Sequence, residues 1–437
     1  MAALLKPRPI AAAILVLGSG AMLALNWPGQ MSWDSVAQLS DGRSGAYNSW
    51  HPPVMAFLLG LFDRLLPGPG LYLLFQAALL LAALLTLLWL VPRPGWRSVA
   101  VALAIMLTPQ MALLQGEIWK DILFANAAIA GFAALALAER HWRAPWIVLA
   151  ALLLALAAAT RQTGVVLLPV AAVTAGLIAR RHARPGWRWG LGFLAATLAL
   201  GLAVTLILAA RGDRGEGAAA QIRLAQSYDL AGAYARDPRL SLPLGQDDPA
   251  LERLLKTRGA ALYTPLRNDP LAADPAISAA IGAVPGAVLG RSWQALAMDH
   301  PGLYLRVRWG AFRAVVTSPD GQACHYAPVG VGGDPARLKA LGLVAQVRPQ
   351  DRALAWYARL FFHTPVYAHL FWIALALIVL AQLGRQGAIA LSGLIVGALV
   401  FVLTFVIVSI ACDYRYLVPL DLAAMAGALG ASGRRDA

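Results

Sequence analysis

Several side chains that can take part in chemistry stand beside the ends of long apolar runs. Asp34 follows the first such run, and His51 stands before two prolines further along the same connecting segment. A carboxylate or an imidazole at such a position can accept a proton from a reacting hydroxyl group. The alternative is structural, because Trp33 and Trp50 are typical anchors at a membrane interface, beside which Asp34 is only solvated and His51 caps or packs.

Cationic and polar side chains gather in three further connecting segments. One is the tight segment from Gln115 to Asp121, one is a short tip that begins at Thr160, and one precedes the last apolar run. Lysine and arginine next to carboxylates at membrane level suit a lipid-linked phosphate or pyrophosphate. Alternatively, the lysine pairs with a neighbouring carboxylate and the arginine at the tip extends to the interface. The candidates are Glu117, Lys120, Asp121, Arg161, Gln162, Arg415, Tyr416 and Asp421.

The composition indicates which solvent surrounds these segments. Of the 437 residues, 59% are hydrophobic and 13% are charged, and the mean hydropathy is +0.64. A soluble domain of this size is far more polar, so a lipid bilayer is the natural surrounding. The net charge of +14 lies in short clusters between apolar runs, which indicates membrane orientation and not nucleic-acid binding.

Apolar runs of about 20 residues predict membrane-spanning helices, and the chain has about ten of them. We therefore predict an all-α polytopic membrane protein with a membrane module of about seven helices over 1–210, an external domain over 211–364 and a module of about three helices over 365–437. A helix near 52–66 is predicted to lie along the interface. The runs are Pro9–Asn26, Gly70–Val91, Val99–Leu114, Ile122–Ala138, Pro145–Ala159, Gly164–Ala179, Gly190–Ala210, Val366–Leu383, Gly387–Ala411 and Tyr416–Gly430.

Lysine and arginine in the short loops predict the orientation, because the positive-inside rule applies to short loops. One face holds thirteen of these residues, Arg434 and Arg435 among them, and the other holds five. Both termini are therefore predicted to be cytoplasmic and the domain over 211–364 to be external. That domain is expected to be mostly helical, with helices over 221–235, 286–298 and 301–316.

The cysteine content excludes a disulfide-rich scaffold and a cysteine-rich metal site, because the chain has 2 cysteines. The predicted topology places both Cys324 and Cys412 on the oxidising side, where they either form one disulfide or remain two buried thiols. The sequence has no nucleotide-binding glycine loop, Walker motif or zinc-type spacing of histidine and cysteine. No particular cofactor is therefore expected.

Taken together, the motifs resemble the GT-C superfamily of multispanning, lipid-dependent glycosyltransferases, which includes protein mannosyltransferases and aminoarabinose transferases. The resemblance covers most of the chain in order. The segment near Asp229 and the segment from Trp293 to Arg308 are also similar to a bacterial branch of this group. The short motifs that carry the resemblance are Asp34 after the first span, His51-Pro52-Pro53, Trp119-Lys120-Asp121, Arg161-Gln162-Thr163-Gly164 and Arg415-Tyr416-Leu417.

The resemblance implies a polyprenyl-phosphate-linked sugar as donor and a glycan, lipid or protein acceptor on the outer, periplasmic face of a cell inner membrane. An inverting transfer needs a base for the acceptor hydroxyl and positive charge for the departing phosphate. Asp34 is the expected base, and Asp121 or Glu117 is the next candidate. Because one carboxylate stands where several members have adjacent acidic residues, a divalent metal is possible but not implied. Phosphate binding is expected from Lys120, Arg161 and Arg415, and further substrate contacts from His51, Glu117, Gln162, Tyr416 and Asp421.

Three other functions fit a polytopic protein with charges on one face. A transporter or flippase for a lipid-linked substrate needs a polar path through the bilayer, but apart from Asp421 and Arg161 the spans carry almost no ionisable groups near the midplane. A lipid-linked glycan polymerase or ligase would use a pyrophosphate carrier. A non-catalytic assembly factor would use the external domain to bind a partner.

Overall fold

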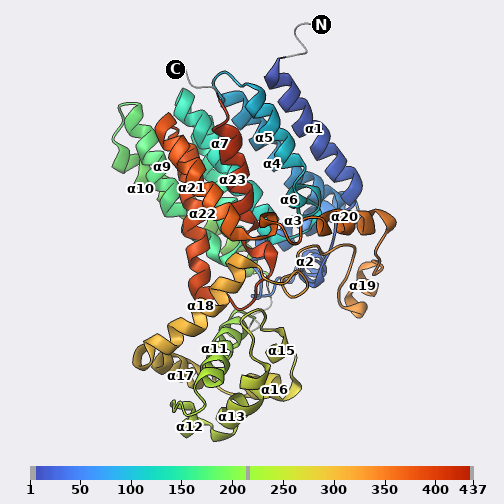
Figure 1. Ribbon diagram of the computed structural model, residues 1–437, viewed down its shortest axis with the longest axis vertical. Coiled ribbons are helices and arrows are strands. Elements are labelled where there is room, and N and C mark those ends of the chain that lie inside the picture. Colours follow the sequence, from blue (N-terminus) through green and yellow to red (C-terminus); the bar gives the residue numbers. More distant parts are fainter. Residues whose placement is uncertain (1–5, 213–216, 434–437) are drawn as a thin grey trace. The chain divides into compact units, whose positions relative to one another are not determined.

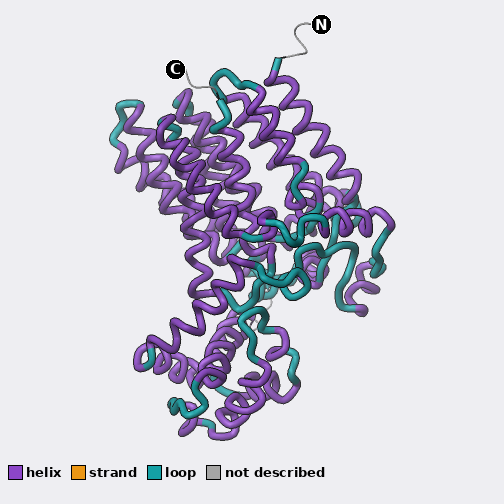
Figure 2. Tube along the Cα trace, viewed as in Figure 1, coloured by secondary structure: helices purple, strands orange, loops and turns teal. Residues whose placement is uncertain are grey.

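In the computed structural model, residues 6–212 and 217–433 are described, and within them the chain forms helices and isolated β-bridges but no strand (Figures 1 and 2). The chain separates into two compact units. The membrane unit comprises Met1–Asp213, Ala327–Val402 and Leu417–Ala437, and the helical unit comprises Arg214–Tyr326 and Leu403–Tyr416. Arg434 and Arg435, which contributed to the predicted orientation, lie outside the described residues.

Long apolar helices that run alongside one another form the body of the membrane unit (Figure 1). Its elements up to residue 209 are α1 (Pro7–Asn26), α2 (Trp33–Ser44), α3 (Pro53–Leu65), α4 (Gly70–Leu90), α5 (Trp96–Met106), α6 (Pro109–Ala112), η1 (Leu114–Gly116), α7 (Lys120–His141), α8 (Ala144–Thr160), η2 (Gln162–Val166), α9 (Leu167–Arg181) and α10 (Gly186–Ala209). Those from residue 335 onward are α19 (Pro335–Leu341), α20 (Pro349–Arg359), η4 (Pro365–Tyr367), α21 (His369–Gln386), α22 (Ile389–Val408), η5 (Tyr414–Leu417) and α23 (Val418–Gly430). The last residues of α22 and most of η5 belong to the helical unit.

Among the described residues, seven helices are long and apolar enough to cross a bilayer, and an eighth span results if one bent pair counts as a single span. The protein is therefore an all-α, polytopic membrane protein. All the apolar runs of the sequence are helical, but there are fewer full-length spans than the predicted ten. The reason is that α8 has 17 residues and α23 has 13, while α5 is broken from α6.

The break between α5 and α6 has a local cause. Pro109 begins α6, and the side chain of Thr108 accepts a hydrogen bond from the backbone N–H of Met111. Because proline has no N–H to continue the ladder of the preceding helix, the helix ends and restarts there. The two pieces are bent by 58°.

Residues 327–364, predicted as part of the external domain, belong to the membrane unit. The backbone N–H of Met31 donates to the carbonyl of Gly330 over 2.9 Å, and Arg43 donates to the carbonyl of Leu341 over 2.7 Å. These bonds attach the segment to α2 and to the loop before it. The boundary between the units therefore falls earlier in the chain than the predicted 364/365.

The helical unit contains the three longer helices that the sequence predicts, with ends that differ by at most four residues. They are α11 (Gly217–Arg236), α17 (Gly286–Asp299) and α18 (Pro301–Thr317). Leu289, Leu296 and Val307 are fully buried in the core that these helices share. The shorter elements are α12 (Leu244–Asp247), α13 (Pro249–Leu254), η3 (Leu255–Gly259), α14 (Ala260–Leu262), α15 (Asp269–Ala272) and α16 (Pro275–Ala283).

A buried ion pair lies inside this core. Arg308 pairs with Asp229, and the indole N–H of Trp293 donates to the same carboxylate over 2.7 Å. Burial raises the pKa of Asp229 to about 6, although Arg308 and Trp293 act in the opposite direction. Arg308 also donates to the carbonyl of Ser409 over 3.1 Å, so the pair attaches the segment 403–416 to the rest of the unit.

Candidate functional site

Asp34, His51 and Lys120 form a line where α2, α3 and α7 begin. Asp34 lies in the first turn of α2, His51 stands just before α3, and Lys120 is the first residue of α7. Lys120 Nζ lies 3.0 Å from His51 Nδ1, and His51 Nε2 lies 3.7 Å from Asp34 Oδ1. The structure thus brings together three side chains that are far apart in the sequence.

This contact with Lys120 sets the proton positions on the histidine ring. An ammonium group can only donate hydrogen bonds, so the contact makes Nδ1 of His51 the acceptor. The proton of a neutral ring is then on Nε2, the nitrogen that faces Asp34. At 3.7 Å the Nε2 to Oδ1 distance is too long for a hydrogen bond, but it leaves an N–H group oriented toward the carboxylate. The side chain of Asp34 is 31% exposed and that of His51 is 10% exposed, so the carboxylate is the more accessible of the two.

Backbone and side-chain bonds hold the beginning of α2 against the segment before α7. The N–H of Ile118 donates to the carbonyl of Gln30 over 3.0 Å. The hydroxyl of Ser35 donates to the carbonyl of Ile118 over 2.7 Å, and the indole N–H of Trp119 donates to the Ser32 hydroxyl over 3.0 Å. Trp119, which is buried, therefore joins the residue before α2 to the residue before α7.

A buried ion pair adjoins this line. Asp121, the residue after Lys120, pairs with Arg161, and their side chains are 1% and 9% exposed. The Arg161 guanidinium carbon lies 5.1 Å from the centre of the Phe401 ring. A guanidinium that has a carboxylate and an aromatic face is well compensated for its burial. Arg161, predicted to hold the donor phosphate, is thus engaged by a protein carboxylate.

The residue after Arg161 reaches back to the loop that carries His51. The side-chain amide of Gln162 donates to the carbonyl of Trp50 over 3.2 Å. The tip between α8 and α9 therefore supports both the buried pair and the loop before α3. Together, Asp34, His51 and Lys120 with the pair and this tip make up what we call the base cluster.

Two other predicted site residues are buried. Glu117 is 1% exposed, and its carbonyl accepts a hydrogen bond from the side-chain amide of Gln76 over 2.9 Å. Asp421 lies 2.9 Å from His369 Nδ1, and both side chains are fully buried between α21 and α23. These positions suit a structural role better than the direct substrate contact predicted for them.

Arg415 and Tyr416 belong to the helical unit. The binding of the donor phosphate by Arg415 and the substrate contact of Tyr416 both stay predictions. The guanidinium of Arg415 lies over the Tyr416 ring, 5.6 Å from its centre, and its Nε is 3.5 Å from Asp413 Oδ2. His325 Nδ1 is 3.0 Å from the same carboxylate. Burial raises the pKa of Asp413, but the bond to His325 and the charge of Arg415 outweigh it and hold the pKa below its usual range.

Cys324 and Cys412 are joined by a disulfide in the helical unit. The chain on both sides of the bridge is also paired, since Tyr414 N–H donates to the carbonyl of Cys324 over 2.7 Å and Cys412 N–H donates to the carbonyl of Leu266 over 2.8 Å. The segment that carries Asp413 and Arg415 is therefore held within its own unit by covalent and hydrogen bonds.

Two histidines that were not predicted from the sequence lie against carboxylates: His325 contacts Asp413, and His369 contacts the predicted site residue Asp421. The position of His325 next to Cys324 could have indicated its contact with Asp413, because Cys324 is bonded to Cys412. Nothing near His369 in the sequence indicates its contact with α23. No group of three or more His, Cys, Asp or Glu side chains within the described parts of the chain is arranged to hold a metal ion.

Comparisons with known proteins give one structural similarity. No protein-family model matches the sequence, and no curated protein matches it. The chain is similar to the archaeal oligosaccharyltransferase AglB from Archaeoglobus fulgidus, solved in complex with an inhibitory peptide and a dolichol-phosphate. The TM-score is 0.40 and the identity is 14%, over 96% of this chain and 50% of AglB, so the chain spans about half the length of that protein. A similarity this low carries no argument about activity, and function has to be argued from the residues of the site.

Proposed function

We propose that this protein is a membrane glycosyltransferase that transfers a sugar from a polyprenyl-phosphate donor to an acceptor on the outer face of a cell membrane. The observation that supports it is the line of Asp34, His51 and Lys120 at the beginning of a membrane-spanning helix. It combines a partly exposed carboxylate and a cation at the level where the phosphate of a membrane-embedded carrier lies.

Asp34 is proposed as the base. In an inverting transfer, the acceptor oxygen attacks the anomeric carbon while the bond from that carbon to the phosphate oxygen breaks. Asp34 takes the proton of the attacking hydroxyl, and the polyprenyl phosphate leaves with the bonding electrons. The Nε2 of His51 lies 3.7 Å from the carboxylate and faces it. His51 is therefore a positioning residue for the base.

Lys120 is proposed to stabilise the departing phosphate. It lies at the first position of α7, where the helix dipole also favours an anion. Positive charge in a water-poor site contributes more than the same charge in bulk water. Arg161 is assigned a supporting part, because it already pairs with Asp121. Asp121 is therefore less suited than Asp34 to act as the base.

The topology proposed for this function has both chain termini in the cytoplasm and the base cluster on the outer face. α7 begins at the cluster with Lys120 and ends with Arg140 and His141, which agrees with basic residues at the cytoplasmic end of a span.

A transfer assay tests the proposal directly. Purified full-length protein is incubated in lipid with radiolabelled polyprenyl-phosphate sugars and a membrane extract as acceptor. Radiolabel is expected to leave the carrier lipid and appear in an acceptor fraction. If no donor of a broad panel loses its sugar above the level of a no-protein control, the proposed function is wrong.

The variant Asp34→Asn separates base catalysis from binding. Asparagine keeps the shape of the side chain but cannot take the proton, so turnover should fall at least about 100-fold while donor binding is retained. Asp41→Asn is the matched control, because Asp41 lies on the same helix and accepts a hydrogen bond from Asn48 over 2.6 Å outside the cluster. Near wild-type turnover in Asp34→Asn would assign the base to another residue.

A further inference from the structure

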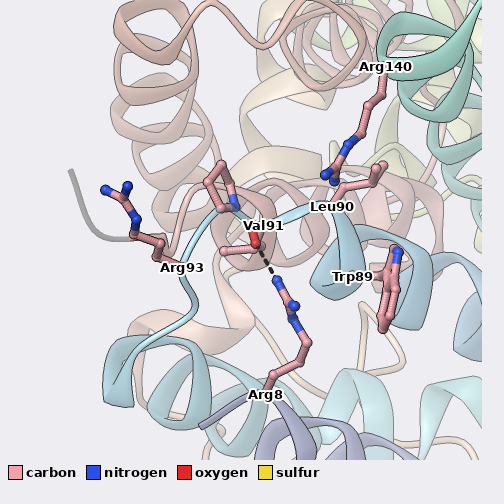
Figure 3. A pocket seen from close by; sticks show the side chains of 7 residues that line it. Arg8, Trp89, Leu90, Val91, Arg93 and Arg140 are labelled. Atoms are coloured by element: carbon pink, nitrogen blue, oxygen red, sulfur yellow. Dashed lines mark hydrogen bonds between the residues drawn. The ribbon is translucent and has the colours of Figure 1, made fainter. Parts of the chain in front are cut away.

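A cavity of about 420 Å³ lies at the other end of the membrane unit from the base cluster. It is lined by Arg8, Trp89, Leu90, Val91, Pro92, Arg93 and Arg140 (Figure 3). These residues come from the beginning of α1, the end of α4 with its following loop, and the end of α7. The volume is within the range of about 300–1,000 Å³ that is typical of small-ligand sites.

The position of the cavity along α7 places it at the opposite membrane surface. Lys120 of the base cluster begins α7 and Arg140 lies near its end, so at ~1.5 Å per residue they are separated by about 30 Å along the helix. This is the thickness of the hydrocarbon core of a bilayer, about 30 Å. The three helices that border the cavity, α1, α4 and α7, are long and apolar enough to span a membrane. α1 begins beside the cavity, and α4 and α7 end there. The cavity therefore lies at the level of lipid headgroups.

The lining of the cavity favours an anion. Among the described residues, the lining contains three arginines and no acidic residue. The closest carboxylate in sequence, Glu139, pairs with Arg181 and accepts the backbone N–H groups of Ile389 and Ala390 over 3.0 and 2.9 Å. That carboxylate is thus already committed to the beginning of α22 and does not neutralise the cavity.

The guanidinium of Arg8 is held in place by two contacts, and one of its N–H groups has no hydrogen-bond partner among the described residues. Its Nη2 donates to the carbonyl of Val91 over 2.8 Å, and its guanidinium carbon lies 5.4 Å from the centre of the Trp89 ring. Its Nε is buried without a hydrogen-bond partner among the described residues. Figure 3 shows Arg8 and Arg140 reaching toward Val91 and Leu90 from opposite sides, so two guanidinium groups approach one short stretch of chain.

We propose that this cavity binds the phosphate of an anionic glycerophospholipid, a site separate from the proposed sugar transfer. Arginines bind phosphate through paired N–H groups, and basic pockets between membrane helices suit lipid headgroups of this kind. A free phosphate ion has the same charge chemistry. The lipid is favoured because Trp89 is 66% exposed beside the cavity, at the level where an indole contacts both acyl chains and headgroups.

The test measures thermal unfolding of the purified full-length protein in detergent during titration with short-chain phosphatidylglycerol, with short-chain phosphatidylcholine, and with inorganic phosphate at matched ionic strength. Phosphatidylglycerol should raise the unfolding midpoint in a saturable manner, and phosphatidylcholine should not. Arg8→Ala and Arg140→Ala should each weaken the apparent affinity for phosphatidylglycerol about tenfold, as expected for the loss of a charge-assisted hydrogen bond.

Arg188→Ala is the matched control. Arg188 lies near the beginning of α10, and its guanidinium carbon is 5.1 Å from the centre of the Trp187 ring, so it repeats the pairing of Arg8 and Trp89 without a place in the cavity lining. The affinity of the Arg188→Ala variant for phosphatidylglycerol should equal that of the wild-type protein. If Arg8→Ala does not fold because the bond to Val91 is lost, Arg140→Ala and Arg8→Lys still test the site.

Three results would overturn the proposal. Equal effects of the two lipids would show that headgroup charge is not recognised. Equal losses of affinity in Arg140→Ala and Arg188→Ala would show a diffuse attraction of the basic surface. A shift by inorganic phosphate at the same concentration as by phosphatidylglycerol would assign the cavity to a free ion.

Discussion

Replacing the buried pair of Asp121 and Arg161 by neutral residues tests whether this arginine holds the protein together or binds the donor. The single variants Asp121→Asn and Arg161→Gln each leave one charge without its partner. Because the two side chains are 1% and 9% exposed, water cannot compensate the remaining charge. Removal of one partner of a buried pair costs about 3–5 kcal/mol in the free energy of unfolding. Arg161→Gln also removes the contact with Phe401, which contributes about 1 kcal/mol.

The double variant should lose less than the sum of the two single losses, because two amides bury no charge and can bond to each other. We expect the coupling energy from the double-mutant cycle to be at least ~2 kcal/mol, in the upper part of the range for residues in contact. The assay is denaturant unfolding of the four purified proteins in the same detergent, followed by binding of a radiolabelled polyprenyl-phosphate sugar to each folded protein.

Two outcomes would refute this reasoning in different ways. Additivity within about 0.5 kcal/mol would mean that the two side chains do not interact in the protein. Wild-type stability of Arg161→Gln together with weakened donor binding would restore the role predicted from the sequence, in which Arg161 binds the carrier phosphate. The conservative variant Arg161→Lys distinguishes these further, because lysine keeps the charge but lacks the planar fork of the guanidinium.

Two predictions concern the helical unit. The disulfide between Cys324 and Cys412 joins residues 88 apart, so Cys324→Ser should lower the free energy of unfolding by about 4–5 kcal/mol in the chain-entropy model, and the denatured wild type should label with a thiol reagent only after reduction. Burial raises the pKa of Asp229 from 3.8 to about 6, so the folded protein retains this proton more strongly than the unfolded chain. The free energy of unfolding should therefore fall by up to ~3 kcal/mol as the pH rises from about 4 to about 6, and denaturant titrations across this window should show a flatter dependence in Asp229→Asn.

The helices could be predicted from the sequence because each apolar run is long and its ends carry charges, glycine or proline. The number of helices that cross the bilayer completely could not be predicted from the sequence. Pro109 stands inside the run Val99–Leu114, and its effect depends on whether neighbours compensate the missing N–H. The boundary between the two units differs from the predicted domain boundary for a similar reason. The polarity of residues 327–364 indicates solvent, but their attachment to α2 depends on bonds that no local pattern encodes.

The sequence predicts that the residues of the base cluster lie on one face. It does not predict which of these side chains contact each other. The order of charges in Trp119-Lys120-Asp121 favours an ion pair within that segment, and the sequence gives no reason to prefer His51 or Arg161 as partners. Those partners follow from tertiary packing, in which the loop before α3 and the tip after α8 both meet the beginning of α7.

The helical geometry of α7 explains why two adjacent residues have different environments. Successive residues on an α-helix point about 100° apart, so Lys120 and Asp121 point in different directions. Lys120 contacts the histidine that faces Asp34, whereas Asp121 points to Arg161 and is 1% exposed. A base must be reached by its substrate and must be able to take up a proton, and a buried carboxylate that compensates an arginine meets neither condition. Among Asp34, Glu117 and Asp121, Asp34 is the most exposed, at 31%, which supports the proposal that it is the base.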